Sequence, residues 1–187
     1  GNDKLNGGEG NDLLSGGAGA DEVDGGGGID AITYAGSSAA VTVNLQTEKA
    51  HGGDATGDRI KNIENVVGSG WNDFLTGSSI ANLLSGEGGD DTIDGGGGND
   101  FLNGGSGNDL LYGGTGNDIV NGDGGSDTLS LFHATGAVTV LFGATAFAGT
   151  ASGGGLGVTS FTGIERVFGS RFADTMIGGA GGEHLWG

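Results

Sequence analysis

Aspartate recurs at every ninth residue in three stretches of this chain. Eleven of the seventeen aspartates share this phase, and Asn82 and Glu183 occupy it in two further copies. Carboxylate and amide oxygens are hard ligands of the kind that calcium prefers, and one ion needs about six to eight of them. The spacing therefore predicts rows of calcium sites, each site shared between copies. The aspartates in phase are Asp3, Asp12, Asp21, Asp30, Asp73, Asp91, Asp100, Asp109, Asp118, Asp127 and Asp174.

Each of these aspartates is the sixth residue of a nonapeptide with the consensus G-G-x-G-x-D-x-U-x, in which U is aliphatic. Glycine at positions one, two and four permits positive φ and close approach of backbones, so the first six residues are expected to form a loop with inward carbonyl oxygens. The last three residues suffice only for a short strand whose middle residue points inward. That eighth position is apolar in all thirteen copies: Leu5, Leu14, Val23, Ile32, Leu75, Leu84, Ile93, Leu102, Leu111, Val120, Leu129, Met176 and Leu185.

Composition sets the conditions under which such loops can fold. Glycine supplies 48 of the 187 residues, proline and cysteine are absent, and the formal net charge is -18. The absence of proline and cysteine excludes a collagen helix and a disulfide scaffold, and the absence of any run of about 18 apolar residues excludes a membrane-spanning helix. The glycine content also argues against a helix bundle, because glycine inside a helix costs about 1 kcal/mol relative to alanine. With a hydrophobic share of only 34%, the chain is expected to be disordered unless something cationic stabilises it.

The nonapeptides fall into blocks separated by two spacers. The expected order is block 1–33, spacer 34–67, block 68–130, spacer 131–168 and an incomplete block 169–187. Because the chain begins and ends inside a repeat, we expect it to be a segment of a longer protein.

The two spacers are related to each other in sequence. Residues 40–45 match residues 137–142, and residues 63–69 match residues 164–170. Their lengths of 34 and 38 residues approach two turns of about 18 residues each, so we expect them to continue the repeat as calcium-free coils. A hairpin looped out of the repeat is the alternative. His51, Asp54 and Asp58 offer a weaker candidate metal site in the first spacer.

These features together resemble the RTX (repeats-in-toxin) family, whose calcium-binding repeats form an all-β, right-handed parallel β-roll. The resemblance implies two nonapeptides per turn, with calcium between the loop of one copy and the loop two copies later. Roughly seven ions are implied, held by Asp3 with Asp21, Asp12 with Asp30, Asp73 with Asp91, Asn82 with Asp100, Asp91 with Asp109, Asp100 with Asp118 and Asp109 with Asp127. Asn82 is expected to weaken its site, and the longer Glu183 to distort the last loop. The carbonyl ligands implied at positions two and four are those of Gly8, Gly10, Gly17, Gly19, Gly26, Gly28, Gly96, Gly98, Gly105, Gly107, Gly114 and Gly116.

Calcium would also relieve the repulsion between stacked aspartates. At about 4 Å and an effective dielectric constant of about 20, two carboxylates repel by about 4 kcal/mol. Roughly seven Ca²⁺ would add about +14 to the formal charge of -18. The free energy of calcium binding would then become free energy of folding, as in small metal-dependent domains.

The resemblance further implies a secreted bacterial protein that leaves the cell by type I secretion and folds outside, where calcium is abundant. We expect a structural or adhesive component of a cell surface or filament, with other copies of itself or cell-surface polysaccharide as partners. A secretion and folding module of a type I secreted enzyme or toxin is the second interpretation, and a carbohydrate-binding module is the third.

No catalytic pattern accompanies the repeat. His51, His133 and His184 lack ligand spacing, and the nucleophile motif G-x-S-x-G and the phosphate-binding lysine motif are absent. The acidic field would repel nucleic acid. We therefore expect neither an enzyme nor a nucleic-acid partner, and we expect the aromatic residues Trp71, Phe101, Tyr112, Phe132 and Trp186 to serve local packing.

Overall fold

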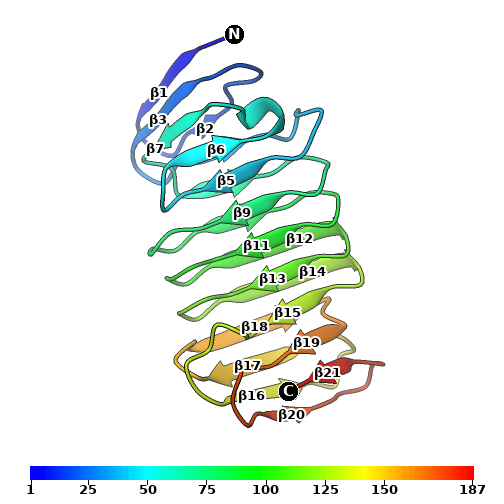
Figure 1. Cartoon of the computed structure of the whole chain (residues 1–187). Helices are drawn as coiled ribbons and strands as arrows, with labels where there is room; N and C mark the ends of the chain where they lie inside the picture. Colours follow the sequence, from blue (N-terminus) through cyan, green and yellow to red (C-terminus); the bar gives the residue numbers. More distant parts are fainter.

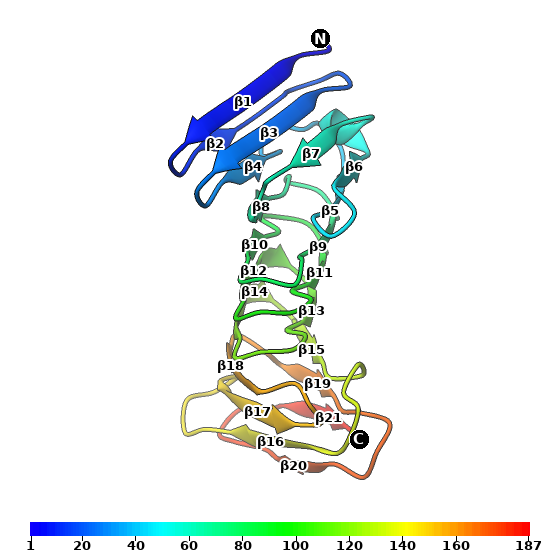
Figure 2. The same cartoon turned by 90° about the vertical axis from the view of Figure 1, so that its left-hand side faces the viewer.

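The computed structural model describes all 187 residues, and its regular structure is almost entirely β-strand (Figure 1). Twenty-one short strands form two sheets of 11 and 10 strands, and a single 3-10 turn covers Gly53–Ala55. No helix in the structure is long and apolar enough to cross a membrane. The two sheets face each other along the whole length of the stack, which places the loops that join them in two rows (Figures 1 and 2).

Sheet A denotes the 11-stranded sheet and sheet B the 10-stranded sheet. In spatial order, sheet A contains β1 (Lys4–Glu9), β3 (Glu22–Gly27), β7 (Arg59–Lys61), β6 (Lys49–His51), β5 (Thr42–Asn44), β9 (Phe74–Thr76), β11 (Thr92–Asp94), β13 (Leu110–Tyr112), β15 (Thr128–Ser130), β19 (Arg166–Phe168) and β21 (His184–Trp186). Sheet B contains β2 (Leu13–Leu14), β4 (Ala31–Thr33), β8 (Asn65–Val67), β10 (Leu83–Ser85), β12 (Phe101–Gly107), β14 (Ile119–Gly125), β18 (Val158–Thr162), β17 (Gly149–Gly153), β16 (Val138–Phe142) and β20 (Thr175–Ile177).

Successive nonapeptides place their strands in alternate sheets. In sheet A, Ile93 pairs with Leu75 on one side and with Leu111 on the other, and both pairings are parallel. Neighbouring strands of one sheet therefore belong to nonapeptides two copies apart, so that two nonapeptides make one coil. The predicted all-β parallel β-roll is confirmed.

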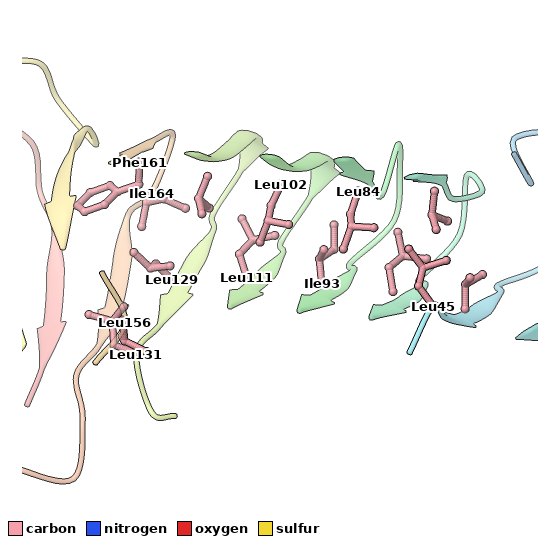
Figure 3. Packing of buried hydrophobic residues seen from close by; sticks show 14 of the residues in the cluster. Leu45, Leu84, Ile93, Leu102, Leu111, Leu129, Leu131, Leu156, Phe161 and Ile164 are labelled. Atoms are coloured by element: carbon pink, nitrogen blue, oxygen red, sulfur yellow. The ribbon is translucent and has the colours of Figure 1, made fainter. Parts of the chain in front are cut away.

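The core lies between the sheets; in the nonapeptide blocks it is a column of aliphatic side chains from the eighth position, and spacer residues such as Leu45, Phe161 and Ile164 continue it (Figure 3). Ile93, Leu102 and Leu111 are fully buried, whereas Phe101, one residue before Leu102, is 39% exposed on the outer face. This alternation follows from the two-residue period of a strand. Each buried Leu or Ile contributes about 1.5–3 kcal/mol, which gives the short strands a stability that their few hydrogen bonds could not supply.

The first spacer continues both sheets, as predicted, but by an unforeseen route. Strands β5, β6 and β7 form an antiparallel meander within sheet A, after which β8 enters sheet B. The hairpin alternative is thus partly realised, since β6 runs antiparallel to its neighbours, yet the meander is not looped out. Its physical reason is burial: Val43, Ala50 and Ile60 point one from each strand into the common core.

The second spacer repeats this meander on the opposite side of the stack. Strands β16, β17 and β18 lie in sheet B, and β19 follows in sheet A. Between β3 and β9, sheet A has three strands where sheet B has one between β4 and β10, and this imbalance is reversed at the second spacer. Figure 2 shows the N-terminal strands β1–β4 set at an angle to the central stack. Each spacer therefore inserts three strands into one sheet and one strand into the other, and we call the three-strand insertion a wedge.

Candidate metal centre

The sixth positions of the nonapeptides stack in two rows, one in front of each sheet. Within a row, the backbone N–H of one residue donates a hydrogen bond to the side-chain Oδ1 of the residue 18 positions later, at 2.7–3.1 Å. The structure thereby brings together all seven predicted pairs: Asp3 with Asp21, Asp12 with Asp30, Asp73 with Asp91, Asn82 with Asp100, Asp91 with Asp109, Asp100 with Asp118 and Asp109 with Asp127. Their role as calcium ligands stays a prediction.

The second carboxylate oxygen of these aspartates has a different environment. Eight Oδ2 atoms are buried without any hydrogen-bond partner, and they belong to Asp12, Asp21, Asp30, Asp91, Asp100, Asp109, Asp118 and Asp127. Buried polar groups in folded proteins nearly always have a partner, and an unsatisfied one costs about 1–3 kcal/mol or more when it is charged. Regularly placed hard oxygens of this kind are suited to a cation such as Ca²⁺.

Backbone carbonyl oxygens lie beside these free carboxylate oxygens. A β-carbon added at Gly95 would be 2.5 Å from Asp100 Oδ2 and 2.5 Å from the carbonyl oxygen of Gly113, which belongs to the next coil. Position one must therefore be glycine, because a side chain would fill the space between the two oxygens. No three acidic or histidine side chains converge on one point, so carbonyl oxygens have to complete any calcium sphere.

The loops owe their shape to glycine at positions two and four. All twelve glycines predicted to offer carbonyl ligands have positive φ, between 74° and 147°. At Gly107 φ is 141°, and an added β-carbon would collide with the carbonyl of Gly89 in the preceding coil. Residues with a β-carbon avoid this region of φ, so the glycines permit coils to stack at close distance.

Burial of the carboxylates makes them hard to ionise in the calcium-free fold. Removal from water, opposed by the N–H donors and reinforced by neighbouring carboxylates, raises the pKa of Asp91 and of Asp100 to about 7. Burial likewise raises the pKa of Asp127 to about 6 and shifts the pKa of Asp109 and Asp118 upward. A divalent cation placed between them would reverse this balance, because it favours the ionised form.

Three loops depart from this arrangement because serine replaces glycine at position two. The Ser69 N–H and hydroxyl donate to the two carboxylate oxygens of Asp73, and Ser170 does the same for Asp174. Ser78 likewise bonds Asn82, whose side-chain amide donates to the carbonyl of Glu64 at 2.6 Å. These three position-six residues thus have local partners, a difference that the serine at position two could have indicated from the sequence.

The ends of the row are also irregular. Asp3 is exposed at the N-terminal edge, where its N–H still donates to Asp21. Glu183 accepts hydrogen bonds from Gly179 and Gly181 within its own loop. The three histidines lie apart, with His133 stacked on Tyr112 and His184 beside Trp186.

Three acidic residues continue the rows although the sequence analysis assigned none of them to a row; it named only Asp58, as part of a different candidate site with His51 and Asp54. The N–H of Asp21 donates to Asp58, that of Asp30 to Glu64 and that of Asp127 to Glu165, at 2.7–2.9 Å. Each acid stands two residues before a buried aliphatic residue, as an aspartate does in the nonapeptide: Ile60, Val66 and Val167. The D-x-U-x half of the consensus, with Glu allowed for Asp, would have found all three.

The two parallel sheets, the coil of two nonapeptides and the rows of carboxylate and carbonyl oxygens define a calcium-binding β-roll. The RTX calcium-binding nonapeptide repeat matches the chain in four copies, at residues 1–32, 67–102, 94–129 and 159–187. These matches cover more than half of the chain, which therefore belongs to the RTX calcium-binding nonapeptide-repeat family, and its repeats are calcium-binding repeats. No curated protein shows significant similarity to it.

Proposed function

We propose that calcium binding drives the folding of this chain outside a bacterial cell, where it serves as a structural or adhesive module of a surface layer or filament. The observation that carries the proposal is the set of eight buried Oδ2 atoms without partners, in a chain of formal charge -18. Without cations these oxygens oppose folding. With calcium they become ligands, and binding adds directly to stability.

An extracellular place of action is supported by the weakness expected of these sites. Each loop offers one carboxylate, and carbonyl oxygens complete the sphere, whereas high-affinity calcium sites gather more charge. Extracellular calcium modules work with dissociation constants of about 10⁻⁴–10⁻³ M. Such a chain stays unfolded at cytosolic calcium levels, which suits the export of an unfolded chain by type I secretion, and it folds on release.

The structural role is supported by an uncharged face on sheet B. The strands of sheet B contain no Lys, Arg or Glu, and their single acid is Asp123. Leu83, Phe101 and Ile119 lie in register on its outer side, with exposed fractions of 43, 39 and 54%. A second copy of the chain can approach this face without like-charge repulsion, whereas its own acidic surface would oppose contact elsewhere.

Circular dichroism during a calcium titration tests the folding proposal. We expect a coil spectrum in chelator and a cooperative gain of β-signal between sub-millimolar and millimolar Ca²⁺. Magnesium at the same concentration is the control, because its strict octahedral geometry does not suit these shared loops. A β-spectrum that is unchanged by chelator would overturn the proposal.

A further inference from the structure

We infer that Glu64 and Glu165, which precede the last strands of the two spacers, complete two further calcium sites with Asp30 and Asp127. The inference rests on the proposed calcium binding and extends it to residues outside the nonapeptide motif. The two sites would lie where each nonapeptide block meets a spacer, so that the spacers are not calcium-free at these ends.

The contact of Glu64 reproduces the contact between paired aspartates. The Asp30 N–H donates to Glu64 Oε2 at 2.8 Å, as the Asp12 N–H donates to Asp30 Oδ1 at 2.8 Å. The Asp30 side chain is fully buried, and its Oδ2 has no partner. A β-carbon added at Gly25 would be 2.6 Å from that Oδ2 and would also collide with the carbonyl oxygen of Asn62. This is the arrangement that Asp100 and Gly113 show beside Gly95.

Glu165 occupies the same position at the end of the second spacer. The Asp127 N–H donates to Glu165 Oε2 at 2.7 Å, and the fully buried Asp127 has an Oδ2 without a partner. Beside Gly122, that Oδ2 and the carbonyl oxygen of Gly163 face the same space. The two glutamates thus make equivalent contacts although one precedes sheet B and the other precedes sheet A.

The length of the loop explains why glutamate stands at these two positions. Only Asn62 and Ile63 separate β7 from Glu64, whereas five residues separate β11 from Asp100. Asn62 adopts φ of 50°, and the equivalent Gly163 adopts φ of 63°, so both short loops turn in the same way. A short loop keeps the backbone of the acidic residue farther from the paired aspartate, and the additional methylene of glutamate extends the carboxylate across that distance. The short loops before Glu64 and Glu165 lack the backbone carbonyls that positions two and four supply in a nonapeptide loop. These two sites therefore need water to complete the calcium coordination sphere and should bind calcium more weakly.

Other spacer residues in the same rows do not qualify. Both oxygens of Asp58 are engaged, one by the Asp21 N–H and the other by the Tyr34 hydroxyl at 3.0 Å. At the corresponding place in the second spacer, Asp118 faces Thr159, which has no carboxylate. The two glutamates are thus the spacer acids that lie beside a buried aspartate with a free oxygen and have only one of their own oxygens engaged.

The test measures bound calcium per chain by equilibrium dialysis of the complete 187-residue chain. The variants are Glu64→Gln, Glu165→Gln and both together; glutamine keeps an oxygen for the N–H of Asp30 or Asp127. We expect each single change to remove one bound ion and the double change to remove two. Glu48→Gln, an exposed residue of the first spacer, is the matched control and should leave the count unchanged.

The possible results separate this inference from the proposed function. An unchanged count in all glutamine variants, together with a loss of bound calcium in Asp109→Asn, overturns the inference and leaves the proposed function standing. Absence of calcium binding by the parent chain overturns both. If the glutamine variants do not fold at saturating calcium, Glu64→Asp and Glu165→Asp provide the test. The shortened carboxylate should weaken one site by about tenfold or more, and unchanged affinity at every site overturns the inference.

Discussion

At the scale of the residue, seven of the aspartates at position six have two separate tasks: Asp21, Asp30, Asp91, Asp100, Asp109, Asp118 and Asp127. One oxygen accepts the N–H of the preceding coil, which holds the coils in register, and the other oxygen is left free within a dry loop. The first interaction is internal to the chain and exists without metal. The second lowers stability until a cation arrives, so the residue that aligns the coils also makes the fold depend on calcium.

The first prediction concerns Asp109, which belongs to two of the seven pairs. Its Oδ1 accepts the Asp91 N–H, and its own N–H donates to Asp127. Asp109→Asn should remove about two bound calcium ions and raise the calcium concentration needed for folding severalfold, as measured by equilibrium dialysis and circular dichroism. The control is Asp123→Asn, because Asp123 is exposed and bonds only Asn121. Equal calcium binding by the two variants would contradict the paired arrangement.

The second prediction concerns pH and follows from the raised pKa of the buried aspartates. Because the pKa of Asp91 and Asp100 is about 7 in the calcium-free fold and about 4 in the unfolded chain, the fold binds protons more tightly than the unfolded chain does. Stability without calcium should therefore be greatest below about pH 4 and be lost as the pH rises through about 7. Circular dichroism of the calcium-free chain at pH 5 and pH 8 checks the sign, with more β-signal expected at pH 5.

In the presence of calcium, the dependence of stability on pH should have the opposite sign. Protons compete with Ca²⁺ for the same carboxylates, so the apparent calcium affinity should fall between pH 8 and pH 6. Calcium-free β-structure that increases with pH would show that the aspartates are not buried as described.

At the scale of the element, the nonapeptide predicts its own structure well because each of its positions has a defined physical role. The period placed Leu111 in the core, and the resemblance to the RTX family paired Asp91 with Asp109. The spacers were harder to predict, since Val43, Ala50 and Ile60 follow no period. Their meander becomes visible only when the two neighbouring coils supply the core that these side chains complete. The pairing of Asp30 with Glu64 was missed for another reason: Glu64 stands nine residues before Asp73, but the five residues before it contain none of the glycines of the consensus.

The third prediction tests whether the meander shares the core of the blocks. Ile60 in β7 is 2% exposed and Ile93 in β11 is 0% exposed, so each truncation to alanine should cost about 2–5 kcal/mol. Denaturant unfolding at saturating calcium measures both changes. Ile80→Ala serves as the control because Ile80 is 54% exposed and should cost little. A loop detached from the solenoid would instead make Ile60→Ala resemble the control.

At the scale of the whole molecule, the two wedges lie on opposite sheets because of the number of nonapeptides between them. Each nonapeptide advances the chain by half a coil, and seven of them start between Gly68 and Gly122. An odd number of half coils brings the second spacer to the side opposite the first, so the bend that three strands introduce into sheet A is countered by three strands in sheet B.

The last prediction changes this parity. Deletion of residues 95–103 removes one nonapeptide, leaves every loop paired with the loop two copies later, and rotates everything beyond it by half a turn. Both wedges then fall on the same side, and the solenoid should change from an offset shape to an arc. Deletion of residues 86–103 removes two nonapeptides, shortens the stack by one coil of about 4.8 Å, and preserves the parity. Small-angle X-ray scattering at saturating calcium should therefore show the parent shape, slightly shortened, for the longer deletion and a more curved particle for the shorter one. Two profiles that differ only by half a coil in length would contradict the assignment of the bends to the spacers.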